Sequence, residues 1–210
     1  EATLRTLPAV DPARADAATI AVVLPDRLVV TVVERQPILV WLIGGARYLV
    51  DVTGTLFARL DPGAADPGLP TVDDRRADSA GLAVGAALDP SDLGAVRQLA
   101  ALTPGFLGSQ ATTLSLAVTD DEGFTLDAGP GLWHAVFGVY TIAVRPPTIV
   151  PQQVQCLASL IAGSPQTRVA EASMDVIRLS LGPARCGTYT VRTAHPTASP
   201  APSPSASARP

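Results

Sequence analysis

The apolar residues of this 210-residue chain stand in short runs that end at glycine, proline or aspartate. The longest strictly apolar run covers only residues 38–43. A helix that crosses a bilayer needs about 20 consecutive apolar residues, so no segment is expected to span a membrane. Many of the runs are rich in valine, isoleucine and threonine, which favour extended backbone. The pattern predicts a fold of short strands joined by tight turns, with few helices.

The composition limits both the core and the chemistry. Hydrophobic residues make up 47% of the chain but aromatic residues only 4%, so the core is expected to consist of aliphatic side chains. The net charge is −4, which argues against nucleic acid as a partner, because a duplex-binding surface needs an excess of basic groups. The 15 basic residues are all arginine. Mechanisms that need a lysine amine, such as Schiff-base formation and P-loop phosphate binding, are therefore excluded.

The beginning of the chain predicts the end of a helix and then a hairpin. Residues 4–7 are typical of a last helical turn, which Pro8 would end. Two β-branched runs follow at residues 19–24 and 28–33, with a Pro-Asp-Arg turn between them. Both runs are apolar at nearly every position, so we expect both faces of the hairpin to be covered along part of their length.

The next part of the chain predicts a meander. Its three runs, at residues 38–43, 47–51 and 55–60, reverse at glycines, because glycine adopts positive φ without strain. Residues 61–91 are rich in Asp, Gly, Pro and Ala and predict mostly loop.

The second half predicts two helices packed on further strands. The Asp89-Pro90 pair is typical of a helix start, and the helix is expected to end at residue 102. Residues 113–128 alternate apolar and polar side chains about an acidic turn, which predicts a hairpin. A second helix is expected after Pro151, because residues 154, 157, 158 and 161 form one apolar face. Strands at residues 174–181 and 186–191 end the folded part.

These elements predict the α+β class, with a mainly antiparallel β domain and two packed helices. From Thr193 onward the chain consists of Ala, Ser and Pro without an apolar pattern, which predicts a disordered tail or extended spacer over residues 193–210.

No cluster of residues predicts a catalytic, metal or cofactor site. His134 is the one histidine within the predicted folded part, and it lies in an apolar strand without a G-x-S-x-G nucleophile motif elsewhere, so a structural role is favoured. The acidic pair Asp73-Asp74 and the run 120–122 lack EF-hand spacing. Solvated turns are favoured over a calcium site for both. An enzyme would need His134 and a nearby serine or aspartate to line one pocket.

The two cysteines leave two alternatives open. Cys156 lies on the second predicted helix, and Cys186 begins the last predicted strand. A disulfide between these adjacent elements is plausible in an oxidising compartment. Two buried free thiols are equally compatible with the sequence, since free cysteine is among the most buried residue types.

The stretch of residues 24–37 resembles the join between the POTRA domain and the β domain of FtsQ/DivIB-type bacterial cell-division proteins. In that family a proline follows one strand, the next strand ends in Glu-Arg-x-Pro, and an aromatic-containing strand leads to a Val-Asp-x-x-Gly turn. The corresponding residues here are Pro25, Glu34, Arg35, Pro37, Trp41, Val50, Asp51, Gly54 and Phe57, and Leu69-Pro70 matches the dipeptide that often follows.

The resemblance implies a domain organisation and a junction. Residues 1–35 would form the C-terminal part of a truncated POTRA-like α/β module, and residues 36–192 the FtsQ-like β domain. Pro25, Glu34, Arg35 and Pro37 would mark the junction. Glu34 and Arg35 are expected on opposite faces at the strand end, available for an ion pair, and Pro37 stiffens the exit. Two charges that merely end a surface strand are the alternative.

The resemblance also implies a function. FtsQ-like proteins are non-enzymatic scaffolds at the extracytoplasmic face of the septal membrane, attached by a single anchor that this sequence lacks. They bind coiled-coil partners of the FtsB/FtsL or DivIC type partly by strand addition to a sheet edge. We expect that edge at residues 175–179, a strand with the sequence Asp175, Val176, Ile177, Arg178 and Leu179. A strand at residues 186–191 could cover it. The alternative function is a secreted or cell-surface β-rich adhesin.

Overall fold

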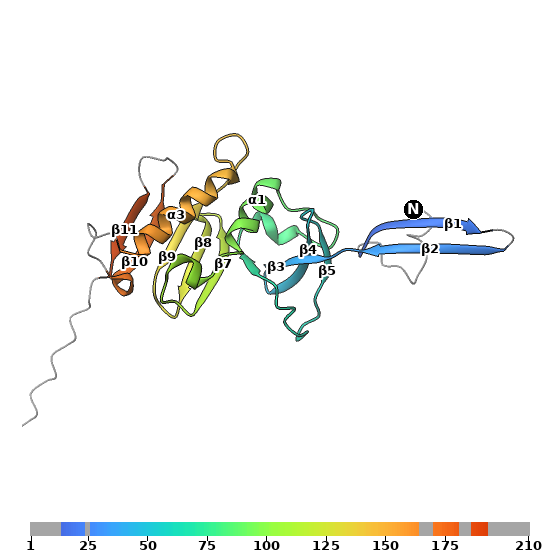
Figure 1. Cartoon of the computed structure of the whole chain (residues 1–210), viewed down its shortest axis with the longest axis horizontal. Helices are drawn as coiled ribbons and strands as arrows, with labels where there is room; N and C mark the ends of the chain where they lie inside the picture. The colour runs from blue at the N-terminus through green and yellow to red at the C-terminus, as the bar shows by residue number, and fades with distance from the viewer. Residues whose placement is uncertain (1–13, 24–25, 164–169, 181–185, 193–210) are drawn as a thin grey trace, which may run out of the picture.

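The computed structural model describes residues 14–23, 26–163, 170–180 and 186–192. It contains a two-stranded sheet and a nine-stranded sheet (Figure 1). Its elements, in chain order, are β1 (Ala15–Val23), β2 (Arg27–Glu34), β3 (Pro37–Ile43), β4 (Ala46–Asp51), β5 (Leu56–Arg59), β6 (Thr71–Asp74), η2 (Asp78–Gly81), α1 (Pro90–Leu99), α2 (Pro104–Leu107), β7 (Thr113–Thr119), β8 (Gly123–Gly129), β9 (His134–Gly138), η3 (Pro147–Ile149), α3 (Val150–Ile161), η4 (Glu171–Ser173), β10 (Met174–Leu179) and β11 (Gly187–Val191). The predicted helix end at residues 4–7, the turn proline Pro25 and the tail 193–210 lie outside the described residues.

The nine strands form one mixed sheet in the order β11-β10-β9-β8-β7-β6-β3-β4-β5. The predicted meander is present as β3-β4-β5, and the predicted hairpin as β7-β8, both antiparallel. Three pairs are parallel: β3 with β6, β6 with β7, and β9 with β10. The chain is therefore α+β with a large, mostly antiparallel sheet.

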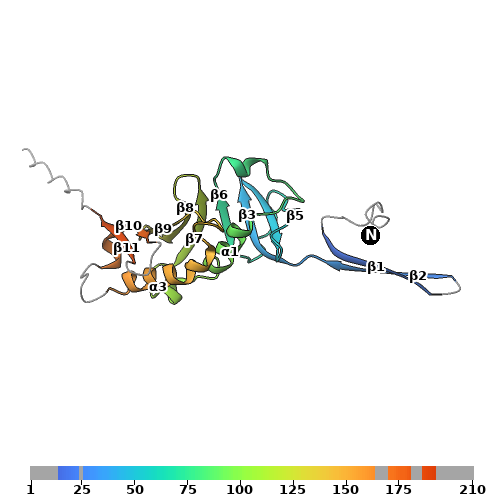
Figure 2. The same cartoon turned by 90° about the horizontal axis from the view of Figure 1, so that it is seen from above.

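The helices cover one face of this sheet. Figure 2 shows α1 and α3 on the same side of the strands. Asp89 caps α1, because its carboxylate accepts a hydrogen bond from the Ser91 amide at 2.7 Å. α3 turns an apolar stripe of Val150, Val154, Leu157 and Ile161 toward the sheet. The Thr-Pro-Gly sequence that was predicted only to end the first helix also starts the short helix α2, where the Thr103 hydroxyl accepts from the Phe106 amide.

Residues 61–91 are mostly loop, as predicted, but they also contain the short strand β6, which the sequence did not indicate. This strand lies in the middle of the sheet and joins the meander to the β7-β8 hairpin. Its sequence is Thr-Val-Asp-Asp, with a single apolar residue, so it lacks the pattern that marks a strand. Pairing on both sides stabilises it instead, since parallel strands satisfy its backbone groups from β3 and β7.

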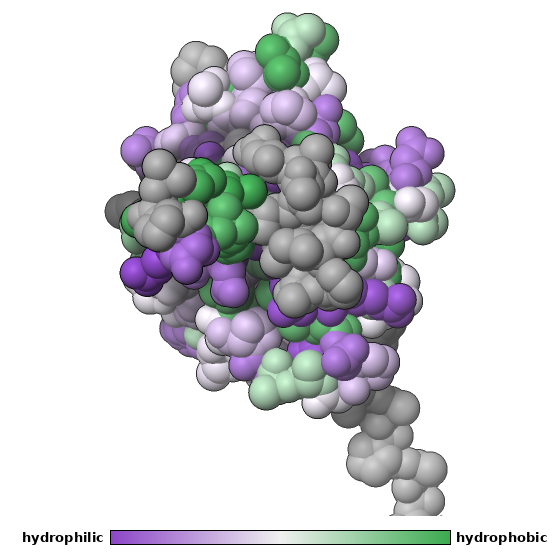
Figure 3. Space-filling view, turned by 90° about the vertical axis from the view of Figure 1, so that its right-hand side faces the viewer, coloured by the Kyte–Doolittle hydropathy of each residue, from purple (hydrophilic) through white to green (hydrophobic). Residues whose placement is uncertain are grey.

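The β1-β2 hairpin extends away from the large sheet along the long axis of the molecule (Figure 1). Its strands pair as predicted, from Ala15 opposite Glu34 to Val23 opposite Arg27. The expectation that both faces are covered is wrong for the described residues, because Val22 and Val23, which point to opposite faces of the hairpin, are 70% and 49% exposed. Figure 3, a view onto the hairpin end, shows apolar surface open on this side. The POTRA assignment and the boundary at residues 35 and 36 stay predictions.

Candidate interaction sites

The predicted junction lies where the hairpin meets the large sheet. The Arg35 amide donates to the carbonyl oxygen of Arg14 at 2.8 Å, which closes the base of the hairpin. The Arg35 guanidinium forms an ion pair with Asp51 on β4 and lies 3.8 Å from the Asp16 carboxylate on β1. Arg35 therefore bridges the two sheets. Glu34, by contrast, is exposed.

Asp51 also holds the turn that follows β4. Its Oδ1 accepts hydrogen bonds from the Thr53 amide at 2.8 Å, the Thr53 hydroxyl at 2.7 Å and the Thr55 amide at 3.0 Å. Burial opposes ionisation of this carboxyl, but these bonds and Arg35 outweigh it and lower the pKa of Asp51. The Val-Asp-x-x-Gly motif is thus a rigid turn whose aspartate also receives the junction arginine. Pro37 begins β3 opposite Asp51.

The predicted acceptor edge at residues 175–179 is not an edge in the structure. β10 pairs in parallel with β9, where Val176 lies opposite His134. On its other side it pairs antiparallel with β11, where Ile177 lies opposite Tyr189. The later strand therefore takes the outer position, because the chain folds back and satisfies the backbone groups that β10 would otherwise expose. Chain order alone could not decide between the two strands.

Within the described residues, β11 is the outer strand at this end of the sheet. Thr188, Thr190 and Val191 are exposed, whereas Tyr189 packs against the core. Ser180 donates its amide to the Cys186 carbonyl at 3.1 Å, and Arg192 donates its amide to the Ser173 carbonyl at 2.9 Å. These bonds tie both ends of β11 to the β10 segment and leave its other edge available for pairing.

Charged side chains connect the strands next to this edge. His134 on β9 has both ring nitrogens bonded to carboxylates: Nδ1 lies 2.7 Å from Asp127 and Nε2 lies 3.0 Å from Glu122. Arg178 on β10 donates to the other oxygen of Glu122 at 3.2 Å. Partial burial disfavours the imidazolium, but the two carboxylates outweigh this and raise the pKa of His134. The pKa of Glu122 is lowered, because bonds from His134 and Arg178 outweigh its burial.

These side chains do not form a catalytic triad. One surface hollow of about 260 Å³ is lined by His134, Asp127 and Ser115. A histidine, an aspartate and a serine in one pocket are what an enzyme of this kind would require. A serine nucleophile needs the free imidazole nitrogen as its base. In this structure that nitrogen, Nε2, faces Glu122 instead. The histidine joins strands and has no nucleophile on either nitrogen. The described residues also hold no group of three or more His, Cys, Asp or Glu side chains placed to bind a metal ion.

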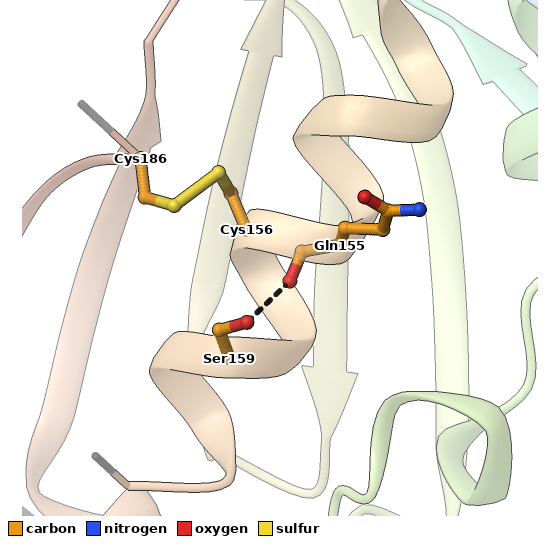
Figure 4. The surroundings of a disulfide bond; sticks show 4 residues. All are labelled: Gln155, Cys156, Ser159 and Cys186. Atoms are coloured by element: carbon orange, nitrogen blue, oxygen red, sulfur yellow. Dashed lines mark hydrogen bonds between the residues drawn. A yellow bond between two sulfur atoms is a disulfide. The ribbon is translucent and has the colours of Figure 1, made fainter. Parts of the chain in front are cut away.

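A disulfide ties β11 to the helix layer. Cys156 on α3 and Cys186, the residue before β11, are bonded, with their Cα atoms 4.9 Å apart. Figure 4 shows the bond leaving the helix one turn before Ser159, whose hydroxyl donates to the Gln155 carbonyl at 2.9 Å. Of the two alternatives that the sequence left open, the structure contains the bonded one.

The acidic pair at residues 73–74 differs from the predicted solvated turn. Asp74 lies on β6 and is 2% exposed. It accepts hydrogen bonds from the Trp41 indole at 2.9 Å, the Ser79 hydroxyl at 2.6 Å and the Arg76 guanidinium at 2.9 Å. Arg76 also bonds Asp92 on α1 at 2.7 Å. The network joins the sheet to the helix and is structural. The run 120–122 lies in the β7-β8 turn, as predicted.

Sequence reasoning missed one buried carboxylate near the β10 end. Glu171, in η4, accepts from the Trp133 indole at 2.7 Å and the Gln110 amide at 2.9 Å, and Ser109 also donates to it. It is 8% exposed. These partners are distant in sequence, so no local pattern marks the residue. The contact fixes the start of β10 against the loop before β7.

Part of the chain is similar to a known protein. The chain is 37% identical over 93 residues to a protein of Chloroflexus aggregans (strain MD-66 / DSM 9485) named cell division protein FtsQ. The aligned part is 43% of this chain and 32% of the relative, so the chain spans about a third of the relative's length. No protein-family model matches the chain. No helix among the described residues is long and apolar enough to cross a membrane.

Proposed function

We propose that this chain is part of a non-enzymatic division scaffold that binds other septal proteins by strand addition. Two findings support the proposal: the similarity to an FtsQ protein, and the outer edge of β11, which pairs with no strand within the described ranges. An edge strand offers backbone N–H and C=O groups to an incoming strand, and these groups supply affinity without a deep pocket. The outer edge of β11 is the observation on which binding by strand addition depends.

The partners proposed are coiled-coil division proteins of the FtsB/FtsL or DivIC type, at the extracytoplasmic face of the septal membrane. Membrane attachment of the full-length protein is part of the same proposal. Arg178, Arg192, Glu122 and Asp175 lie beside the edge and are partly exposed, so they can set the register of the added strand through charge. The role itself is tested by depleting the full-length protein, which should give filamentous, undivided cells.

The mechanism is tested at Val191. Hydrogen-bonded residues alternate along an antiparallel strand, and Arg192 donates to Ser173, so the Val191 amide points away from β10. Val191→Pro removes that outward donor, while Val191→Thr keeps it. We expect proline to weaken binding of the extracytoplasmic part of the partner by about tenfold or more, and threonine by less than about twofold.

The outcomes of this titration are separable. Unchanged binding by Val191→Pro, with an unchanged circular dichroism spectrum, would exclude the β11 edge. Absence of binding by the unsubstituted protein to either partner class would exclude the scaffold proposal. Loss of partner binding by Val191→Pro together with retained binding by Val191→Thr supports strand addition.

A further inference from the structure

We propose that the Cys156–Cys186 bond is a redox-dependent anchor that keeps β11 docked as the acceptor strand. The inference rests on the proposed function, since it concerns the regulation of the same edge. Oxidised protein would present β11 in place, and reduction would release β11 and weaken partner binding.

The first support is that β11, in the described part of the sheet, pairs with β10 alone. It pairs with β10 over a short register that shifts between Met174 and Ile177. Among the described residues, a further contact of its side chains lies at the surface: Thr190 Oγ1 accepts from the Val176 amide at 3.1 Å. The flanking Arg192 lies 3.8 Å from Asp175 and also donates to the Gly131 carbonyl. Tyr189 is the β11 side chain that packs against the core. Such a strand is expected to open locally at low cost.

The second support is the firm attachment of the other end of the bond. Cys156 lies on α3, whose residues Val150, Leu157 and Ile161 are buried against the sheet. The bond therefore couples the loosely held strand to a well-packed helix (Figure 4). It closes a loop with a sequence separation of 30 residues, which removes conformational freedom from the open form.

The third support is access for a reductant. Cys186 is exposed and Cys156 is only half-buried. A dithiol can attack one sulfur as its thiolate and form a mixed disulfide with one cysteine. The second thiol of the dithiol then attacks the mixed disulfide and releases the cysteine that was bonded to the reductant. The products are two cysteine thiols and the oxidised dithiol, so two electrons and two protons pass to the protein. A disulfide of the same class restores the bond by the reverse exchange.

The anchor is tested without a partner by hydrogen exchange on the oxidised chain, on the chain reduced with dithiothreitol, and on the double variant Cys156→Ser, Cys186→Ser. We expect the β11 amides that face β10 to exchange about tenfold faster or more after reduction, and equally fast in the double variant. Amides of β7 and β8 should not change. Unchanged exchange in β11 would overturn the inference. So would equal acceleration throughout the sheet, which would assign the bond to global stability.

The regulatory part is tested by titrating the extracytoplasmic part of the coiled-coil partner into the same three samples. Oxidised protein should bind at least about tenfold more tightly than the reduced and double-variant samples, because its acceptor strand is preorganised. Equal affinity in all three would overturn the inference and leave the proposed function intact. Tighter binding after reduction would also overturn the inference, because release of β11 would then have exposed β10 as the acceptor strand. No binding in any sample would reject the proposed function itself.

Discussion

Arg35 and Asp51 show how one ion pair can fix a junction. The Asp51 side chain is 4% exposed and the Arg35 side chain 20%, so the pair is largely removed from water. Asp51→Asn keeps an oxygen for the Thr53 and Thr55 bonds, but it removes the buried counter-charge of the guanidinium and leaves only the exposed Asp16 carboxylate 3.8 Å away. We expect the free energy of unfolding to fall by about 1–3 kcal/mol, measured by urea denaturation.

The matched control for this change is Asp16→Asn. Asp16 lies farther from the same guanidinium and is 57% exposed, so its loss should change stability little. The lowered pKa of Asp51 also predicts the direction in which stability changes with pH. Because the folded pKa of Asp51 is lowered, its stabilisation is present above the unfolded pKa and is lost as the pH falls through the folded value. A variant that kept wild-type acid sensitivity would contradict this assignment.

His134 predicts the opposite pH dependence. Its folded pKa is raised, so its stabilisation is complete below the unfolded pKa of about 6.5 and is lost as the pH rises through the folded value. Glu122 remains ionised across that range, because its folded pKa is lowered. We expect the stability of the wild type to fall relative to His134→Gln between about pH 5.5 and 8, in parallel denaturation series.

Two comparisons make the histidine test decisive. Asp127→Asn should remove part of the same pH dependence, because it deletes the carboxylate at Nδ1. His195 is present in every variant and cancels in the difference. Identical pH profiles for wild type and His134→Gln would show that the two carboxylates do not stabilise the imidazolium.

The sequence could identify some of the site residues and not others. Arg35 and Asp51 stood out because both belong to motifs with fixed spacing. Asp74 did not, since a buried aspartate and a turn aspartate look alike until Trp41 and Arg76 are placed around it. Long-range partners decide whether a carboxylate is solvated, and a local pattern does not contain them.

Among the elements, β8 and β9 meet at a pair of glycines that leaves no room for a side chain. Gly123 has φ +67°, and a Cβ placed there would collide with the backbone of Gly138. We expect Gly123→Ala to destabilise the protein by about 2–5 kcal/mol, from backbone strain and the clash together. Thermal denaturation followed by circular dichroism measures the change.

Gly68→Ala separates these two causes. Gly68 has φ +69° but open space around its Cβ position, so only the strain applies. Its cost should be about 1–2 kcal/mol. If both substitutions cost the same, the close approach of β8 and β9 contributes nothing.

The strands themselves were predictable to different degrees. β3, β4, β7 and β8 carry apolar alternation or glycine turns and were placed from the sequence. β6 was missed, because its place in the sheet comes from parallel partners that lie far away in the chain. The order of β10 and β11 was also beyond the sequence, since both read as strands and only pairing assigns the edge.

The two candidate sites lie at opposite ends of the nine-stranded sheet. The junction lies beside the hairpin, and the β11 edge lies at the far end of the nine-stranded sheet (Figure 1). The cores between them form one continuous cluster on the helix side. This separation means that a substitution at the junction should leave the β11 edge folded, because distant, independent sites act additively.

The same arrangement predicts that the large sheet folds without the hairpin. The described contacts between the two sheets centre on Arg35, and the buried core draws its residues from β3 onward. We expect a chain of residues 36–192 to unfold cooperatively in urea. In this chain Arg35 is absent, so water is expected to solvate the Asp51 carboxylate in place of the guanidinium. A peptide of residues 14–35 should remain largely unfolded, because an isolated two-stranded hairpin is marginal in water. Starting the chain at Arg35 instead provides the matched control, since it retains the guanidinium. Failure of both longer chains to fold would show that the hairpin belongs to the same folding unit, and the division at residues 35 and 36 would then be wrong.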